Sequence, residues 1–332
     1  MRPREATIAV TYKCNARCSM CNIWKSPSPK EMEPEHYSKL PTSIRSINIT
    51  GGEPFLRKDL VDVVRRIHLR APSSRMVFST NGFLTDTIVS TVSEVRSFHR
   101  RVGVGVSVDG LEEMHDRVRG SDGAFKKAMS TIEGLKRSGV KDLRIGMTLS
   151  ADNAASASEV YELSKKLGVQ FTVTFAHNSE IYFQKSDNVA PEFTGQAGGS
   201  LADVMRAQLQ SGAVKDWLRA YHIRGIMDPE LRKEFVSKCE AGSRFFFMSP
   251  SGDVYPCMVM NMPIGNLREV DGWDSLFKGG TEERIRRAVK GCREDCWMVC
   301  NTRSLIISHP FRAGKWVVVN KFRAGVRDKK AI

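Results

Sequence analysis

The segment ATIAVTYKCNARCSMCNIW, residues 6–24, runs from a strand-like stretch directly into three closely spaced cysteines. Residues 6–12 are rich in residues that favour β-strands, and Cys14, Cys18 and Cys21 follow as C-x3-C-x2-C. Three thiolates on one short loop suit three corners of a [4Fe–4S] cluster and leave its fourth iron for an outside ligand. Because a zinc site normally takes four ligands, the spacing favours an iron–sulfur cluster over zinc.

Short apolar runs then alternate with helical patterns as far as residue 176. This alternation predicts a parallel sheet, and we expect an α/β fold built on a partial (β/α)6 barrel or an open sheet. The motifs GGEP (51–54), STNG (79–82) and SVDG (107–110) each follow an expected strand, where such folds place their ligand sites. Further strands are expected at 44–50, 75–82, 102–110, 143–150 and 169–176, with helices at 56–71, 86–95, 124–139 and 156–168.

The other five cysteines all lie after residue 238. Clustered cysteines in a chain without a secretory signal favour metal binding over disulfides. The stretch FFFMSPSGDVYPC (245–257) predicts a hairpin that turns at Ser251-Gly252-Asp253, and the last three cysteines are spaced four apart, as on one helical face. We therefore expect a second metal site in a small C-terminal unit. The five cysteines are Cys239, Cys257, Cys292, Cys296 and Cys300.

The C-x3-C-x2-C loop after the first strand and GGEP after the second resemble the radical S-adenosylmethionine (SAM) superfamily. The resemblance implies that Cys14, Cys18 and Cys21 bind a [4Fe–4S] cluster whose open iron binds SAM. It also implies that GGEP receives the methionine amino group, that Ser107 and Asp109 contact the ribose, and that Arg117 or Arg119 holds the SAM carboxylate. The expected SAM-binding residues are Gly51, Gly52, Glu53, Pro54, Asn81, Ser107, Asp109 and Arg119.

The C-terminal cysteines resemble the auxiliary-cluster extension called SPASM, or its shorter form, twitch. With five cysteines, the resemblance implies one auxiliary [4Fe–4S] cluster, held by Cys239, Cys257 and two of the last three cysteines. The remaining thiol is either unused or a hydrogen-atom donor. Candidate catalytic residues are Cys292 as that thiol, His177 at the end of the sixth strand and Asp253 in the hairpin; an ordinary strand-end histidine and a turn aspartate are the alternatives for the last two.

Four regions are expected along the chain. They are a radical SAM core at 1–180, a lid or linker with a helical connection at 181–235, an auxiliary-cluster domain at 236–302 and a basic segment at 303–332. Residues 178–200 are polar and turn-rich and are expected to form a loop or lid. Helices are expected at 201–210 and 214–225. The basic segment contains the strand-like pieces ISHPF (307–311) and KWVVVNKF (315–322).

The net charge of +14 is uneven, because residues 301–332 carry eight Lys and Arg against Asp328 alone. This excess is either a solvated basic end or a contact with an anionic substrate, an acidic partner or an acidic membrane surface. Nucleic acid is disfavoured because no RNA motif with interleaved aromatic residues is present. The chain lacks a long apolar run and a secretory signal, so we expect a cytoplasmic protein; its oligomeric state is left open.

The resemblance implies a radical SAM oxidoreductase or isomerase. One electron, from a donor such as flavodoxin or ferredoxin, would cleave SAM to a 5′-deoxyadenosyl radical, which abstracts hydrogen from a sugar, a lipid or another small molecule. The outcome would be oxidation, epimerisation or bond formation. A peptide maturase is one alternative, disfavoured because the chain starts directly at the first core strand. A zinc-stabilised protein that binds nucleic acid or a partner is the alternative from another class.

Overall fold

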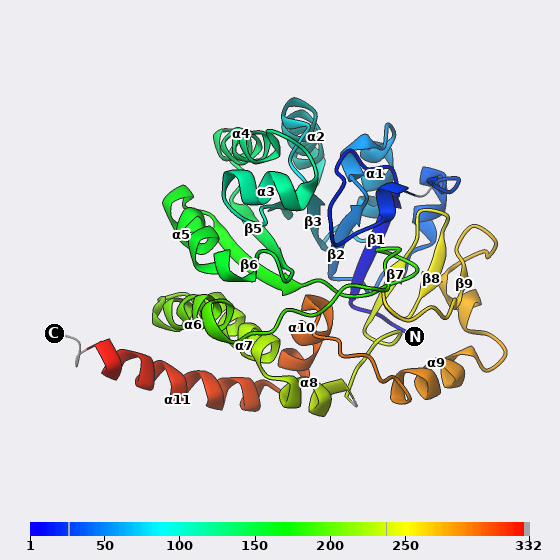
Figure 1. The fold of residues 1–332 in the computed structure, drawn as a ribbon. Helices are drawn as coiled ribbons and strands as arrows, with labels where there is room; N and C mark the ends of the chain where they lie inside the picture. Colours follow the sequence, from blue (N-terminus) through cyan, green and yellow to red (C-terminus); the bar gives the residue numbers. More distant parts are fainter. Residues whose placement is uncertain (26, 237, 329–332) are drawn as a thin grey trace.

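The computed structural model describes residues 1–25, 27–236 and 238–328. Figure 1 shows a curved sheet whose outer side is covered by helices, while helix α10 lies at its open side. The expected α/β architecture is confirmed. Lys329 and Lys330, which were counted in the basic segment, lie outside the described residues.

All six predicted strands of the core form, and each pairs in parallel with the next one along the chain. The last of them, β6, lies at one edge of the sheet, and β1 lies between β2 and β7. The barrel is therefore open, as expected for a partial (β/α)6 fold. The strands are β1 Glu5–Thr11, β2 Ser46–Gly51, β3 Arg75–Thr80, β4 Val102–Ser107, β5 Asp142–Leu149 and β6 Gln170–Phe175.

Helices form between the strands because their apolar residues recur at helical spacing. In the helix after β2, for example, Val63, Val64 and Ile67 are fully buried against the sheet. In the core and the connection, two α-helices escaped prediction, one after β4 and one after residue 228. The helices of the core and the connection are α1 Leu60–Arg70, α2 Thr85–Phe98, α3 Glu112–Arg119, α4 Ala124–Arg137, α5 Ala157–Leu167, α6 Gly195–Gln210, α7 Val214–Met227 and α8 Pro229–Val236. Short 3₁₀ helices lie at Ile23–Lys25, Pro34–Lys39, Pro54–Leu56, Ala154–Ser156 and Trp273–Phe277.

The inner face of the barrel is polar. Along β5, Leu143, Ile145 and Met147 are buried, whereas the alternate residues Arg144 and Thr148 line an internal cavity. This period of two is the normal alternation of side chains along a strand. Barrel interiors are usually filled by Val, Ile and Leu, so the polar inner face leaves a cavity where a packed core would otherwise lie.

The C-terminal hairpin forms as predicted and extends the core sheet. Strand β7 (Phe245–Met248) pairs in parallel with β1, and β8 (Asp253–Tyr255) and β9 (Gly265–Asn266) follow in antiparallel order. The hairpin is thus part of one nine-stranded sheet, because the apolar run at the start of the hairpin covers the free edge of β1. The expected domain boundaries stay predictions.

Two predictions for the C-terminal third were wrong. The strand-like pieces at 307–311 and 315–322 belong to helices, because Pro310 starts a helix and Ala313, Val317 and Ala324 form its buried face at helical spacing. The last three cysteines do not share a helical face, since only Cys300 lies in a helix. The helices are α9 Thr281–Lys290, α10 Val299–Ser308 and α11 Pro310–Asp328. None of the described helices has the length and apolar character needed to span a bilayer.

Candidate functional site

The three N-terminal cysteines lie on the loop after β1 and line one cavity of about 410 Å³. The loop is fixed by backbone hydrogen bonds to the end of α3, since the N–H groups of Arg17 and Ser19 donate to the carbonyls of Arg119 and Val118. The Arg119 guanidinium also donates to Cys18 Sγ at 3.6 Å. The loop therefore presents its thiols to the cavity at the carboxyl end of the sheet.

The segment after β6 covers this loop from the other side. The Asn22 N–H donates to the Phe183 carbonyl at 2.8 Å, and the Tyr182 hydroxyl lies 2.7 Å from Thr50 Oγ1. Tyr182 and Phe183 both line the cavity. The lid predicted at 178–200 thus begins with residues that pack on the cysteine loop.

The two glycines of GGEP bring the end of β2 against the cysteine loop. A Cβ atom on Gly51 would lie 2.0 Å from the Thr11 carbonyl oxygen, and one on Gly52 would lie 2.3 Å from that of Lys13. Gly51 also has a φ of +143°, which side chains rarely tolerate. Both glycines line the cavity, so their main chain is available to a ligand there.

Glu53 connects the ends of β2 and β3 from behind the cavity wall. Its carboxylate accepts hydrogen bonds from Thr80 Oγ1 at 2.9 Å and from the Asn81 N–H at 2.8 Å. Burial raises the pKa of Glu53 to about 7. Pro54 starts the short helix that follows. The predicted contacts of Glu53 and Pro54 with SAM stay predictions.

The predicted residues after β3 and β4 divide into cavity-lining and supporting groups. Asn81 and Ser107 line the cavity, and Asn81 donates to Asn15 in the cysteine loop at 2.7 Å. Asp109 is fully buried and forms an ion pair of 2.6 Å with Arg119. Asp109 therefore positions Arg119, and its contact with a ribose stays a prediction.

Arg119, and not Arg117, is placed to meet a ligand. Arg119 is 8% exposed and lines the cavity, whereas Arg117 is exposed. Burial alone would lower the pKa of Arg119, but the adjacent Asp109 carboxylate and Cys18 raise it. The Nε atom of Arg119 is buried and makes no hydrogen bond within the described part of the chain.

The five C-terminal cysteines lie near one another, behind the far side of the same cavity. Burial and the nearby thiols of Cys257 and Cys292 raise the pKa of Cys239. Cys296 and Cys300 also lie near Cys257 and Cys239. Cys300 lines the cavity together with Met298 and Val299. Both cysteine groups therefore open onto one space.

The candidate catalytic residues differ in their position relative to the cavity. His177 lines the cavity, but Phe175 O lies 2.8 Å from its Nδ1 and the Trp297 N–H donates to its Nε2 at 3.2 Å. Burial lowers the pKa of His177 to about 4, so the ring is neutral and holds β6 to the cysteine segment. Neither Asp253 nor Cys292 belongs to the lining of the cavity.

Asp253 organises the hairpin turn. Its carboxylate accepts from the hydroxyls of Ser249 and Ser251 and from the Asn266 amide. These contacts match the turn interpretation of Ser251-Gly252-Asp253. A catalytic role for Asp253 or Cys292 stays a prediction.

Several cavity residues were not predicted. They include Arg75, Arg144 and Arg303 on its inner wall. The available signal was a charged residue at the inward position of an otherwise apolar strand, as in LRIGMTL (143–149).

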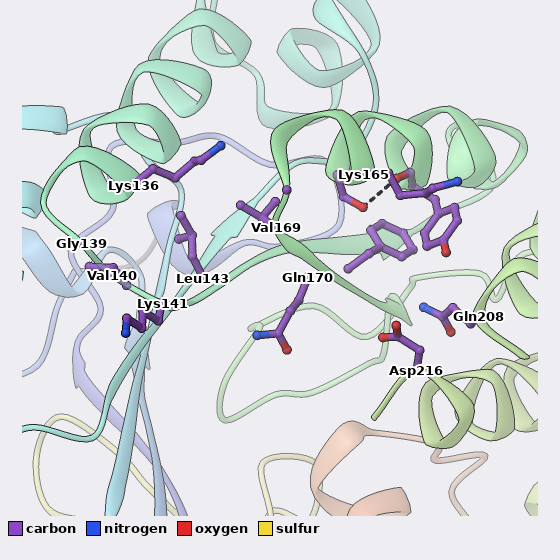
Figure 2. Close-up of a pocket in the computed structure, with 14 residues that line it drawn as sticks. Lys136, Gly139, Val140, Lys141, Leu143, Lys165, Val169, Gln170, Gln208 and Asp216 are labelled. Atoms are coloured by element: carbon purple, nitrogen blue, oxygen red, sulfur yellow. Dashed lines mark hydrogen bonds between the residues drawn. The ribbon is translucent and has the colours of Figure 1, made fainter. Parts of the chain in front are cut away.

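A second cavity, of about 560 Å³, lies on the outside of the sheet between the ends of α4 and α5. Figure 2 shows Lys136, Lys165 and Gln170 around it. Its lining contains none of the predicted site residues, so the inner cavity is the candidate functional site.

Comparison with known families agrees with this arrangement. Residues 8–163 match the radical SAM superfamily, and residues 239–301 match SPASM, an iron–sulfur cluster-binding domain. The chain belongs to the radical SAM superfamily. A radical SAM core with a SPASM domain has a SAM-binding [4Fe–4S] cluster and auxiliary iron–sulfur clusters.

Similar radical SAM proteins have diverse names. An AdoMet-dependent heme synthase of Methanosarcina barkeri is 28% identical over 297 residues, which cover 80% of each chain. Sporulation killing factor maturation protein SkfB of Bacillus subtilis is 26% identical over 291 residues, 85% of this chain and 66% of SkfB. The structure of Streptococcus suis SuiB bound to S-adenosylmethionine matches this chain with a TM-score of 0.62 at 18% sequence identity. The match covers 86% of this chain and 68% of the SuiB chain. This structural likeness establishes the shared fold.

The side chains fit the clusters that the family implies. Burial raises the pKa of Cys14 to about 12 and that of Cys21 to about 11, so these thiols are protonated until a metal displaces their protons. No three His, Cys, Asp or Glu side chains among the described residues are arranged around a single ion. A multi-iron cluster instead distributes its thiolates over separate irons, and three thiols lining one cavity suit it.

Proposed function

We propose that this protein is a radical SAM oxidoreductase or isomerase that acts on a substrate held between its two cysteine groups. The observation that carries the proposal is the shared cavity, which Cys14, Cys18 and Cys21 line at one side and Cys300 at the other. When bound, the cluster and SAM supply a 5′-deoxyadenosyl radical that removes hydrogen from a substrate carbon.

The chain's own residues would bind the reactants and exclude water. Cys14, Cys18 and Cys21 would hold the first cluster, and Arg119 would hold the SAM carboxylate with the donors that Asp109 leaves free. Tyr182 closes the cavity at the carboxyl end of β2, where its hydroxyl is fixed by Thr50. A water-excluded cavity protects reactive intermediates from side reactions.

The second group would hold one auxiliary [4Fe–4S] cluster. Cys239 and Cys257 are the two ligands on either side of the hairpin, and two of Cys292, Cys296 and Cys300 would complete the set. Cys300 is the member of this group that lines the cavity. If a thiol returns hydrogen to the substrate, Cys300 is therefore better placed than Cys292.

A small-molecule substrate is the first choice, because the cavity of about 410 Å³ has to hold SAM beside the first cluster as well as the substrate, which leaves little room for a large one. A peptide is the second choice, and it is favoured by relatives that are named maturases, such as SkfB and mycofactocin maturase MftC of Mycolicibacterium smegmatis, which is 27% identical over 258 residues. The zinc-stabilised binding protein finds no support in either family match.

The test is substrate-dependent release of 5′-deoxyadenosine. The cluster-replete protein is incubated anaerobically with SAM and a flavodoxin reducing system, together with either the low-molecular-weight or the peptide fraction of an extract. We expect the low-molecular-weight fraction to stimulate release, and the Cys257→Ala variant to convert no substrate. Stimulation by the peptide fraction alone would overturn the small-molecule assignment.

A further inference from the structure

The cavity continues from the SAM-binding region toward the amino-terminal ends of the strands. There it is lined by Arg75 of β3, Arg144 of β5 and Arg303 of α10, with Glu5 of β1 as the acidic residue of the same lining. These charged residues serve no purpose in SAM binding as described above. Their arrangement indicates a separate subsite within the proposed active site.

Arg144 lies across the neighbouring strand β4. It pairs in register with Gly105, and a Cβ atom on Gly105 would lie 3.2 Å from Arg144 Nε. Any larger residue at position 105 would displace the guanidinium. The glycine in β4 thus makes room for the arginine on the inner wall.

The arginines near Arg144 have partners, and Arg144 does not. Arg75 pairs with Asp142 at 2.6 Å, and Arg303 pairs with Glu5 at 3.4 Å. Across the described residues, the Arg144 guanidinium makes neither a hydrogen bond nor an ion pair. A guanidinium offers five N–H donors in a fixed fork, and placing it unpaired inside a protein costs free energy.

The charge around this position is positive. Burial and the nearby Arg75 lower the pKa of Arg144 to about 10, so it remains charged at neutral pH. Arg75 and Arg303 add two cations, each already balanced by a carboxylate. One positive charge therefore remains without a balancing group.

We propose that Arg144 binds an anionic group of the substrate, a carboxylate or a phosphate, at the amino-terminal end of the cavity. The arginine fork suits either group because both present two oxygens in a plane. This inference rests on the proposed function, since it places one end of the substrate in the same cavity.

The position of Arg144 also limits the length of the substrate. Thr148, whose N–H donates to Asp109 beside the SAM-binding region, lies four residues further along β5. Four residues of strand span about 13 Å. The substrate's anionic group and its reacting carbon would therefore be separated by on the order of 10 Å, a distance that excludes very small acids.

The test measures anion binding by calorimetry on the cluster-replete protein with SAM, with inorganic phosphate and succinate as probes. We expect Arg144→Gln and Arg144→Met each to weaken binding of at least one probe by about tenfold or more. Arg100→Gln is the matched control, because Arg100 is an exposed arginine outside the cavity, and we expect it to bind as the wild type does. Glutamine is polar and methionine is apolar, so the two Arg144 variants remove the charge in different ways. Either variant that retains its iron is sufficient to test whether Arg144 binds the anion.

Equal affinity of the wild type and the Arg144 variants for both probes would overturn the inference. So would an equal loss in Arg100→Gln, which would indicate a general effect of charge. If phosphate binds more strongly than succinate, the substrate is phosphorylated. If succinate binds more strongly, the substrate carries a carboxylate. A wild type that binds anions but cleaves no SAM would refute the proposed function alone, whereas cleavage without anion binding would refute only this subsite.

A second, independent observation concerns α11, whose outer face is apolar. Its inner face packs through Ala313, Val317 and Ala324. Phe311 and Phe322, however, are 91% and 74% exposed, and they lie eleven residues apart, which returns to the same side of a helix. Val318 and Val319 are also exposed between them.

Basic residues of α11 flank this face, and one of them, Arg312, pairs with Glu234 of α8. Lys315 and Arg323 are exposed, and residues 310–327 contain no Asp or Glu. A second copy of the chain would bring the same positive charges together, so self-association is disfavoured. We infer that the outer face of α11 contacts an anionic lipid surface, where basic side chains meet headgroups and aromatic rings enter the interface.

Vesicle co-sedimentation tests this contact. We expect the protein to bind phosphatidylcholine vesicles that contain phosphatidylserine and not phosphatidylcholine alone, and the double variant Phe311→Ser/Phe322→Ser to bind at least about tenfold less. Leu69→Ser is the control, because Leu69 is a 68% exposed residue on α1. The inference would be overturned if the protein bound neither vesicle or bound both equally. It would also be overturned by an equal loss of binding in Leu69→Ser, or by self-association of the protein that the double variant abolishes.

Discussion

Cys18 and Cys300 line the same cavity, although they lie at opposite ends of the chain. Cys18 is fixed by the loop after β1, and Cys300 stands in the first turn of α10, at the open side of the barrel. Because β7 pairs with β1, the N-terminal cysteine loop and Cys257 both follow strands of one continuous sheet. A substrate between them would be in reach of both.

Trp297 links α7 to the C-terminal cysteines, and this link predicts an effect of Gly225→Ala. A Cβ atom on Gly225 would lie 2.0 Å from the Trp297 ring, which is fully buried between Cys296 and Cys300. Displacing the ring should disturb both cysteines and lower the iron content from about eight to about four per chain. Iron and sulfide analysis of the anaerobically purified wild type and Gly225→Ala variant measures this change in iron content.

Gly199→Ala is the control for this change. Gly199 is also inside a helix, α6, and a Cβ atom there meets open space. We expect it to keep the full iron content and to gain slight stability, because alanine favours helices over glycine. Equal iron in both variants would show that Trp297 does not hold the auxiliary site.

The ion pair between Asp109 and Arg119 predicts a large effect on stability. Asp109→Asn keeps an acceptor for the Thr148 N–H but leaves the buried guanidinium without its carboxylate. We expect a loss of about 3–5 kcal/mol in the free energy of unfolding, measured by urea denaturation. Asp203→Asn, which breaks an exposed ion pair with Arg206, should cost less than about 1 kcal/mol. Similar losses in the two variants would contradict the structural role given to Asp109.

Buried His222 predicts that stability falls in mild acid. Burial lowers the pKa of His222 from 6.5 to about 4, and its ring lies 3.0 Å from the Val173 carbonyl oxygen and from Thr302 Oγ1. The unfolded chain therefore takes up this proton first, so stability is full above pH 6.5 and declines as the pH falls toward 4. At pH 5 the loss from this residue is about 2 kcal/mol.

Urea denaturation of the wild type and of His222→Gln at pH 8 and pH 5 measures how much His222 contributes to this loss of stability. The variant lacks the titrating ring, so its stability should fall by about 2 kcal/mol less between the two pH values. Other buried histidines, such as His177, titrate in both proteins and cancel in the comparison. An identical pH dependence would mean that His222 is not held neutral by the fold.

The core was predictable from sequence because its signals are local. Each strand is a short apolar run, each helix repeats its apolar residues, and GGEP and the cysteine loop follow strands directly. The C-terminal third was harder, because its structure depends on tertiary contacts. The stretch KWVVVNKF (315–322) has strand-like composition, yet Val317 packs as part of a helix against α6 and α7.

The site was predictable where a motif defined it and not where packing did. The eight cysteines follow from motifs, and the sequence limits the SAM carboxylate's partner to Arg117 or Arg119. The choice of Arg119 depends on its burial in the cavity wall and on its ion pair with Asp109. Arg144 carries no motif. Its position became interpretable only once the register with Gly105 placed it on the inner wall.

The most direct test of the account is the release of 5′-deoxyadenosine from SAM by the reduced, cluster-replete protein. Anaerobic incubation with SAM and dithionite, followed by chromatography, measures it, with Cys18→Ala as the control that lacks one ligand of the SAM-binding cluster. The account predicts release by the wild type and none above background by Cys18→Ala. A wild type that carries its full iron and sulfide but releases no more 5′-deoxyadenosine than Cys18→Ala would contradict it.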